Sequence, residues 1–147
     1  MDTEVGIGDE ETLVTIIREN AEDEAIQYAE DQLYRHNMDM TAEAKTREVM
    51  RSLIETTPLE STLASSWEAA KSSRRAFDEK IANNRKHASN MFPNAVLRRA
   101  TARAAKPDAR VVNRNPEQVS RLSRVLHDRI FGGDDAFFGW PLSRYYA

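Results

Sequence analysis

The most regular part of the chain is LESTLASSWEAAKSSRRAFDEKI, residues 59–81. Pro58 precedes it, and because a proline pushes the residue before it out of the helical region, a new helix is expected to begin at Leu59. Side chains then recur in alternating steps of four and three, the spacing that aligns them along one side of an α-helix. The segment therefore predicts a helix of roughly 25 to 30 residues with one seam facing a core. That seam consists of Leu63, Trp67, Ala70, Arg74, Phe77 and Ile81, and the stem of Arg74 is expected to pack while its head group reaches solvent or a partner.

Helical spacing also dominates the residues before this segment. Asn20 and the acidic run 22–24 predict a break between two helices, with Asn20 capping the second. Thr41 is expected to cap a further helix that runs to about Ile54 and is stopped by Thr57-Pro58. The inward-facing sets are Leu13, Ile16, Ile17 and Ala21; then Ala25, Ile26, Ala29 and Leu33; then Val49, Met50, Leu53 and Ile54.

The residues after the segment predict two more helices. Phe92-Pro93-Asn94 marks a boundary, and a short Ala- and Arg-rich helix is expected over 95–105. Asn115-Pro116-Glu117-Gln118 is the strongest helix start in the chain, because Asn suits the cap and Pro suits the first turn. Gly132-Gly133 is expected to end this helix. Its apolar stripe is Val119, Leu122, Leu126 and Ile130.

Together these patterns predict an all-α protein, a small bundle of about five helices. Five Gly and five Pro are too few for a turn-rich β sandwich, and the sequence contains no convincing strand. We expect one domain in three parts. These are an acidic-to-mixed helical body at 1–92, a basic connecting arm with a short helix at 93–114, and a C-terminal helix with a docked aromatic tail at 115–147.

Charge is divided along the chain. Residues 1–60 carry 16 acidic and 5 basic side chains, a net of −11, and residues 61–147 carry 8 acidic and 16 basic side chains, a net of +8. These sum to the overall −3, so a near-neutral total conceals an acidic half and a basic half. Such asymmetry indicates a polyanionic partner, or contact between acidic and basic surfaces within or between chains.

The basic half predicts a candidate nucleic-acid-binding site. Arginine predominates there, and its planar fork suits bidentate contact with phosphate. Three interpretations stay open: phosphate binding, charge matching with carboxylates of the first 60 residues, or a solvated face. Contact would be with the backbone of DNA or RNA rather than with base edges. The candidate residues are Arg85, Lys86, Arg98, Arg99, Arg103, Lys106, Arg110 and Arg114.

The last 11 residues hold five of the 11 aromatic side chains of the chain. Aromatic side chains gain much free energy from burial, so this tail is expected to dock. It docks either on its own bundle or on a neighbouring copy, where aromatic side chains are typical interface anchors. The candidate interface residues are Phe137, Phe138, Trp140, Leu142, Tyr145 and Tyr146.

Nothing in the sequence indicates catalysis. His36, His87 and His127 lie on separate predicted helices without ligand spacing, so we expect no catalytic residue, no metal site and no cofactor. The chain has no cysteine, which excludes disulfides and thiolate chemistry. No apolar run approaches the roughly 20 residues of a membrane span. We therefore expect a protein of the cytoplasm or of an assembled particle such as a virion, without a membrane partner.

These observations favour a non-enzymatic structural or assembly subunit, of the viral or phage capsid, connector or nucleoprotein type. Its partners would be copies of itself or other subunits, and DNA or RNA phosphates. The acidic half of one copy would meet the basic half of the next, head to tail. The alternative is a small regulatory protein-binding module that uses the acidic residues 9–31 as a nucleic-acid mimic.

Overall fold

The computed structural model describes the backbone of residues 7–105 and the side chains of residues 11–105. The regular elements in this part of the chain are all helices, with no strand, which confirms the all-α prediction. The helices are α1 (Ile7–Arg35), α2 (Glu43–Thr56), α3 (Leu59–Asp78), α4 (Arg85–Asn90) and α5 (Phe92–Ala104).

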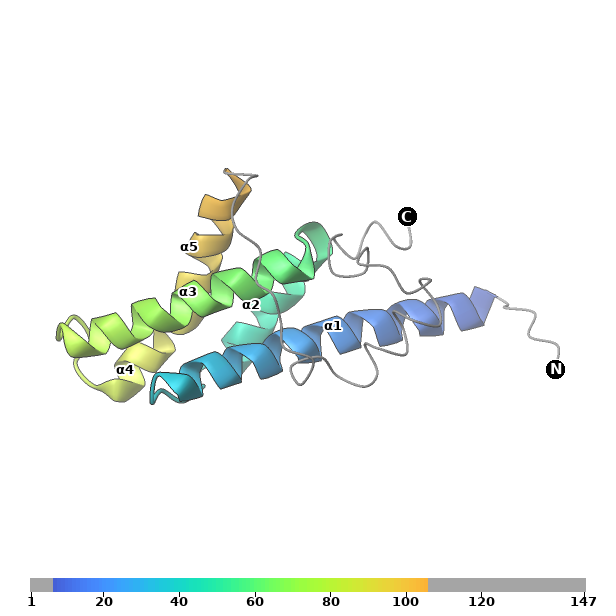
Figure 1. The fold of residues 1–147 in the computed structure, drawn as a ribbon. Helices are drawn as coiled ribbons and strands as arrows, with labels where there is room; N and C mark the ends of the chain where they lie inside the picture. Colours follow the sequence, from blue (N-terminus) through green and yellow to red (C-terminus); the bar gives the residue numbers. More distant parts are fainter. Residues whose placement is uncertain (1–6, 106–147) are drawn as a thin grey trace.

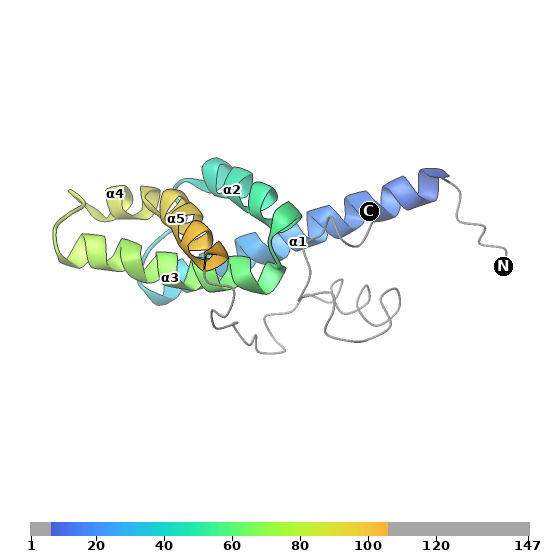
Figure 2. The same ribbon diagram turned by 90° about the horizontal axis from the view of Figure 1, so that it is seen from above.

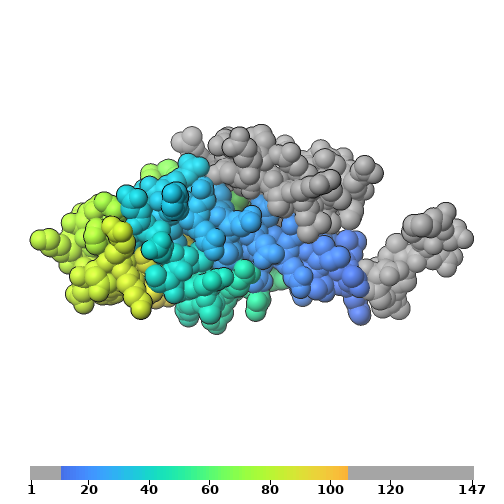
Figure 3. Space-filling model, turned by 90° about the horizontal axis from the view of Figure 1, so that it is seen from below, coloured from blue at the N-terminus to red at the C-terminus, as the bar shows by residue number. Residues whose placement is uncertain are grey.

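The three longest helices form the body of the bundle. α2 runs back along α1, and α3 then runs beside α1 in the same direction as α1 (Figure 1). α5 crosses α3 and packs on it, while the N-terminal part of α1 projects beyond the other helices in both views (Figures 1 and 2). α1 and α2 together make up much of one face of the molecule (Figure 3).

The predicted break near Asn20 is wrong, because α1 is one continuous helix of 29 residues. Asn20 is 5% exposed and lies within the buried side of the helix, so it does not cap a new one. Ile17, Ala21, Ala25, Ala29 and Leu33 follow at intervals of four, and all are buried. The acidic residues 22–24 interrupt the apolar pattern but not the helix. Glu22, the first of them, accepts hydrogen bonds from Arg47 and Arg51 of α2.

The α2 prediction is largely confirmed. Val49, Met50 and Ile54 are buried, Leu53 is partly buried, and the helix ends before Pro58 as expected. Thr41, however, does not cap it. The residue before the helix is Ala42, which makes no side-chain cap, and the Thr41 hydroxyl instead donates to Oδ1 of Asn90.

α3 is 20 residues long, shorter than predicted, and its buried side differs from the expected seam. Leu63 and Ala70 are buried, but Trp67 is 40% exposed and Ile81, beyond the helix, is 63% exposed. Small residues line the interior instead, and they let neighbouring helices approach closely. They are Thr62, Ser65, Ser66, Ala69, Ala70, Ser73 and Ala76.

α5 belongs to the same core as α1, α2 and α3. Phe92 is 1% exposed, and Val96 is fully buried. The helix starts at Phe92, and Pro93 lies in its first turn. Backbone N–H groups in the first turn have no acceptor within the helix, so the N–H that proline lacks costs no hydrogen bond. The expected division at 92/93 therefore does not separate a basic arm from the body, because α5 is part of the body.

The stretch between α3 and α5 is irregular except for the short α4. Asn84 caps α4, its side-chain oxygen accepting from the backbone N–H of His87 at 2.8 Å. Residues 79–84, between α3 and α4, are not helical. The predicted helix after Asn115 and the aromatic tail at 137–147 lie outside the described residues.

Candidate nucleic-acid interface

The acidic half neutralises part of its own charge. Glu22 on α1 accepts two hydrogen bonds from Arg51, both at 3.1 Å, and one from Arg47 at 3.2 Å. The Arg51 hydrogen bonds hold the pKa of Glu22 below its usual value, with Arg47 adding to the effect against the opposing influence of burial. Arg47 also bonds Asp23 at 3.2 Å, and Arg18 pairs with Glu55 at 2.8 Å. Carboxylates of α1 and α2 are therefore paired with arginines of the same two helices.

This pairing weakens the acidic surface that a nucleic-acid mimic would need. Glu22 and Asp23 are engaged by arginine, and the Glu24 residue is only 2% exposed. Asp31 is bonded to Arg35 at 3.0 Å. Within residues 11–31, four of the carboxylates proposed for mimicry are thus paired or buried.

The basic half also contains internal pairs. Arg74 bonds Asp78 at 3.1 Å, and Arg75 bonds Glu79 at 2.9 Å, each one turn along α3 or just past its end. Arg103 on α5 pairs with Glu68 on α3 at 3.2 Å, and its side chain is 11% exposed. Arg103, one of the eight candidate nucleic-acid-binding residues, therefore joins two helices of its own chain.

The contacts of Arg99 and Arg103 fix the register between α5 and α3. Arg99 Nη2 donates to the Ser72 hydroxyl at 3.2 Å, and Arg103 reaches Glu68 one turn away on both helices. The two helices thus run antiparallel along this contact, with the α5 arginines beside the 68–72 turn of α3. Ser72 is a neutral partner, and a guanidinium has five N–H donors, so Arg99 keeps its charge and most of its donors available.

Four of the eight predicted nucleic-acid-binding residues are exposed on α4 and α5. Arg85 lies 5.5 Å from the Phe77 ring centroid, a contact that leaves its charge unneutralised. Lys86 and Arg98 form no salt bridge with the described residues. We call Arg85, Lys86, Arg98 and Arg99 the basic surface. Lys106, Arg110 and Arg114 lie outside the described residues.

Sequence reasoning missed an exposed aromatic residue on α3. Trp67 was placed in the core seam, yet 40% of it is exposed, with Lys71 Nζ 3.5 Å from the ring centroid. Trp67 and Lys71 lie one turn apart on α3, whereas Glu68 and Ser72, the partners of Arg103 and Arg99, point to a different side of that helix. The small residues of α3 mark the interior side of the helix, and Trp67 lies off that side. This spacing is the pattern from which the exposure of Trp67 was predictable.

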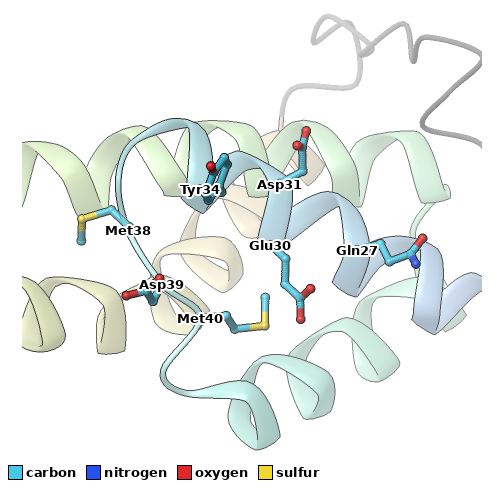
Figure 4. Close-up of a pocket in the computed structure, with 7 residues that line it drawn as sticks. All are labelled: Gln27, Glu30, Asp31, Tyr34, Met38, Asp39 and Met40. Atoms are coloured by element: carbon cyan, nitrogen blue, oxygen red, sulfur yellow. The ribbon is translucent and has the colours of Figure 1, made fainter.

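An acidic hollow of about 650 Å³ lies where α1 meets the connection to α2 (Figure 4). Tyr34 beside it is 77% exposed. Carboxylates here repel phosphate, so the phosphate-binding surface does not extend over this end of α1. The residues lining the hollow are Gln27, Glu30, Asp31, Tyr34, Met38, Asp39 and Met40.

The described histidines have structural contacts. His87 Nδ1 accepts from the Asn83 backbone N–H at 3.0 Å, and the His36 carbonyl accepts from Arg74 at 3.1 Å. Between residues 11 and 105, no three side chains of the metal-binding types gather closely enough to hold an ion. Among the described helices, none has the length and apolar character of a membrane span.

Comparison of the chain with protein families, with curated proteins and with solved structures gave no match.

Proposed function

We propose that this protein is a non-enzymatic helical assembly subunit that binds the phosphates of nucleic acid through its basic surface. One observation carries the proposal. Every described arginine of residues 11–60 is paired with a carboxylate of that half, whereas Arg98 and Lys86 make no salt bridge with the described residues. The cations of the basic surface are thus available to the anions of a partner.

The chemistry of the basic surface suits a phosphate backbone. Arginine supplies a planar fork of donors that matches phosphate oxygens, and Lys86 adds a point charge. The backbone of a nucleic acid carries regularly spaced charges, so several cations held on one rigid scaffold each add a phosphate contact. α5 is such a scaffold because Phe92, Val96 and Ala100 fix it to the core.

The assembly part of the proposal rests on the sequence. Phe137, Phe138, Trp140, Leu142, Tyr145 and Tyr146 are proposed to form a subunit interface. A capsid, connector or nucleoprotein component, acting in the cytoplasm or inside a particle such as a virion, combines these two surfaces. The mimic alternative is less favoured because Glu22 and Asp23 are already bonded to Arg47.

Fluorescence anisotropy with a labelled oligonucleotide tests the nucleic-acid proposal. The double variant Arg98→Gln/Arg99→Gln is expected to bind at least 10-fold more weakly at low salt than the wild type, since each phosphate contact is lost independently. The matched control is Arg35→Gln, an exposed arginine of α1 that lies beside the acidic hollow. The proposal would be contradicted if the wild type did not bind the oligonucleotide. It would also be contradicted if the double variant and Arg35→Gln bound it with equal affinity.

Light scattering tests the assembly proposal separately. We expect a mass well above 16.7 kDa after nuclease treatment, and a fall to the mass of the shortened monomer, below 16.7 kDa, when residues 137–147 are removed. A nuclease-treated wild type of monomer mass would contradict this part alone.

A further inference from the structure

α5 has one side in the core and one side facing solvent. Phe92, Val96 and Ala100 follow at intervals of four, and all are buried. On the opposite side, exposed residues recur at spacings of three and four, which aligns them along the helix. We call these residues the outward face of α5, and they are Asn94, Leu97, Arg98 and Thr101.

The side chains of the outward face are available to a ligand. Asn94 and Arg98 make no hydrogen bond or salt bridge with the described residues, and Leu97 is 44% exposed. Thr101 is exposed, and its hydroxyl donates to the Leu97 carbonyl at 2.9 Å, so its methyl group is the part left for an apolar contact. The face thus offers one free amide, one free guanidinium and two apolar groups.

The surroundings of this face attract a polyanion. No carboxylate occurs between Arg85 and Ala104, the stretch that forms α4 and α5. Arg85 and Lys86 lie on α4, which is separated from α5 by Met91 alone. The C-terminal part of α5 extends beyond α3 (Figure 1). A polyanion laid along the outward face therefore meets cations of these two helices and no carboxylate of theirs.

The dimensions of α5 fit the major groove of B-form DNA. An α-helix with its side chains is about 10 to 12 Å across, and that groove is about 12 Å wide. Thr101 follows Asn94 by seven positions, a rise of about 10.5 Å, which corresponds to about three base pairs. The major groove of an RNA duplex is too deep and narrow for side chains to read. Duplex DNA is therefore the nucleic acid that the outward face fits.

We propose that α5 enters the major groove of duplex DNA and that its outward face reads base edges, with a preference for A·T pairs. The inference rests on the proposed function and specifies its ligand, because it adds base contacts to the phosphate contacts. The amide of Asn94 presents a donor and an acceptor that match N7 and N6 of adenine. Leu97 and the methyl group of Thr101 match the C5-methyl group of thymine. Arg98 lies at the edge of the face and keeps its phosphate contact.

Selection from a randomised pool of DNA duplexes tests whether the protein reads sequence. The wild type is expected to enrich duplexes that share a run of about three base pairs containing A·T pairs. In fluorescence anisotropy, Asn94→Ala is expected to bind the enriched duplex roughly 5- to 150-fold more weakly than the wild type. Its affinity for the unselected pool should stay within about 2-fold, because phosphate contacts do not depend on sequence. Gln27→Ala is the matched control, since it removes an exposed amide of α1 beside the acidic hollow and should change neither affinity.

Uracil in place of thymine provides a second readout, in which the DNA is changed and the protein is not. The two bases differ only by the C5-methyl group, which faces the major groove. The wild type is expected to bind the uracil form of the enriched duplex more weakly than the thymine form. The double variant Leu97→Ala/Thr101→Ser removes both apolar contacts and is expected to bind the two forms equally. Both residues are exposed, so these substitutions leave the core intact.

The failure of this inference differs from the failure of the proposed function. A wild type that binds the duplex pool but enriches no sequence, or only sequences without A·T pairs, overturns base reading while phosphate binding stands. So does tighter binding of single strands or RNA than of duplex DNA of equal length. Base reading is also overturned if Asn94→Ala keeps the wild-type preference, or if the wild type binds the thymine and uracil forms equally. No binding of any oligonucleotide by the wild type overturns both proposals.

Discussion

Replacing Phe92 with Ala tests whether α5 belongs to the core that positions the basic surface. The Phe92 residue is 1% exposed and begins α5. A buried aromatic side chain removes about 200 Å² from water, which at about 25 cal/mol per Å² corresponds to about 5 kcal/mol. Alanine retains part of that burial, and the cavity adds a cost, so we expect a loss of about 3 to 5 kcal/mol in the free energy of unfolding.

Urea denaturation followed by circular dichroism measures this loss. Leu97→Ala is the matched control, because Leu97 lies on the same helix but is 44% exposed, and we expect it to cost less than about 1 kcal/mol. If α5 were an arm attached to an independent body, unfolding of that body would be insensitive to Phe92. Equal midpoints for Phe92→Ala and the wild type would therefore refute the reasoning.

Two further predictions concern polar contacts. Glu22→Gln is expected to lower stability at pH 7 by about 1 kcal/mol, a value near that of surface pairs because the arginine head groups are partly in water. The native pKa of Glu22 lies below its ordinary value of 4.5, so this contribution is present above pH 4.5 and disappears as the pH falls through the native pKa. The urea midpoints of Glu22→Gln and the wild type should therefore converge at low pH. A difference between the midpoints that stays constant down to the acid transition would contradict the pairing. Asn84→Ala removes the side-chain oxygen that accepts from the His87 N–H and is expected to lower the free energy of unfolding by about 1 kcal/mol. Asn84→Asp keeps an acceptor and should lower it less. Equal losses of stability in the two variants, measured by thermal denaturation, would show that the cap is not the cause.

The helical class, the interior of α2 and most of the interior of α1 follow from the sequence, but Ile16, expected to face inward, is 36% exposed. Leu33, Met50 and Ile54 recur with helical spacing, and all are buried. Pro58 ends α2 by local sterics, which is why that boundary was predictable.

The interior of α3 was mispredicted because its pattern was read from the largest side chains. Trp67 continues the spacing of Leu63 but turns toward solvent, while Ser66 and Ser73 face the interior. Ser66 satisfies its hydroxyl on the Thr62 carbonyl at 3.1 Å, so a polar side chain is buried without an unmet bond. Hydrophobicity alone does not reveal small polar residues that face the interior.

The candidate site was predictable in composition and not in geometry. Arginine enrichment on 85–99 is visible in the sequence, but the pairing of Arg103 with Glu68 joins residues 35 apart. Likewise, the break expected at Asn20 ignored arginines of α2 that lie beside the acidic run in space. Long-range pairs of this kind depend on helix packing, which no local pattern encodes.

The salt dependence of oligonucleotide binding tests the central claim most directly. For single strands, the logarithm of the binding constant falls with the logarithm of salt concentration by about 0.7 per phosphate contact, so four cations on the basic surface give a slope of about −3 or steeper. Arg98→Gln/Arg99→Gln is predicted to reduce the steepness by about 1.4, and Arg35→Gln is predicted to leave it unchanged. A wild-type slope near zero, or one that the double variant does not alter, would contradict phosphate binding by this surface.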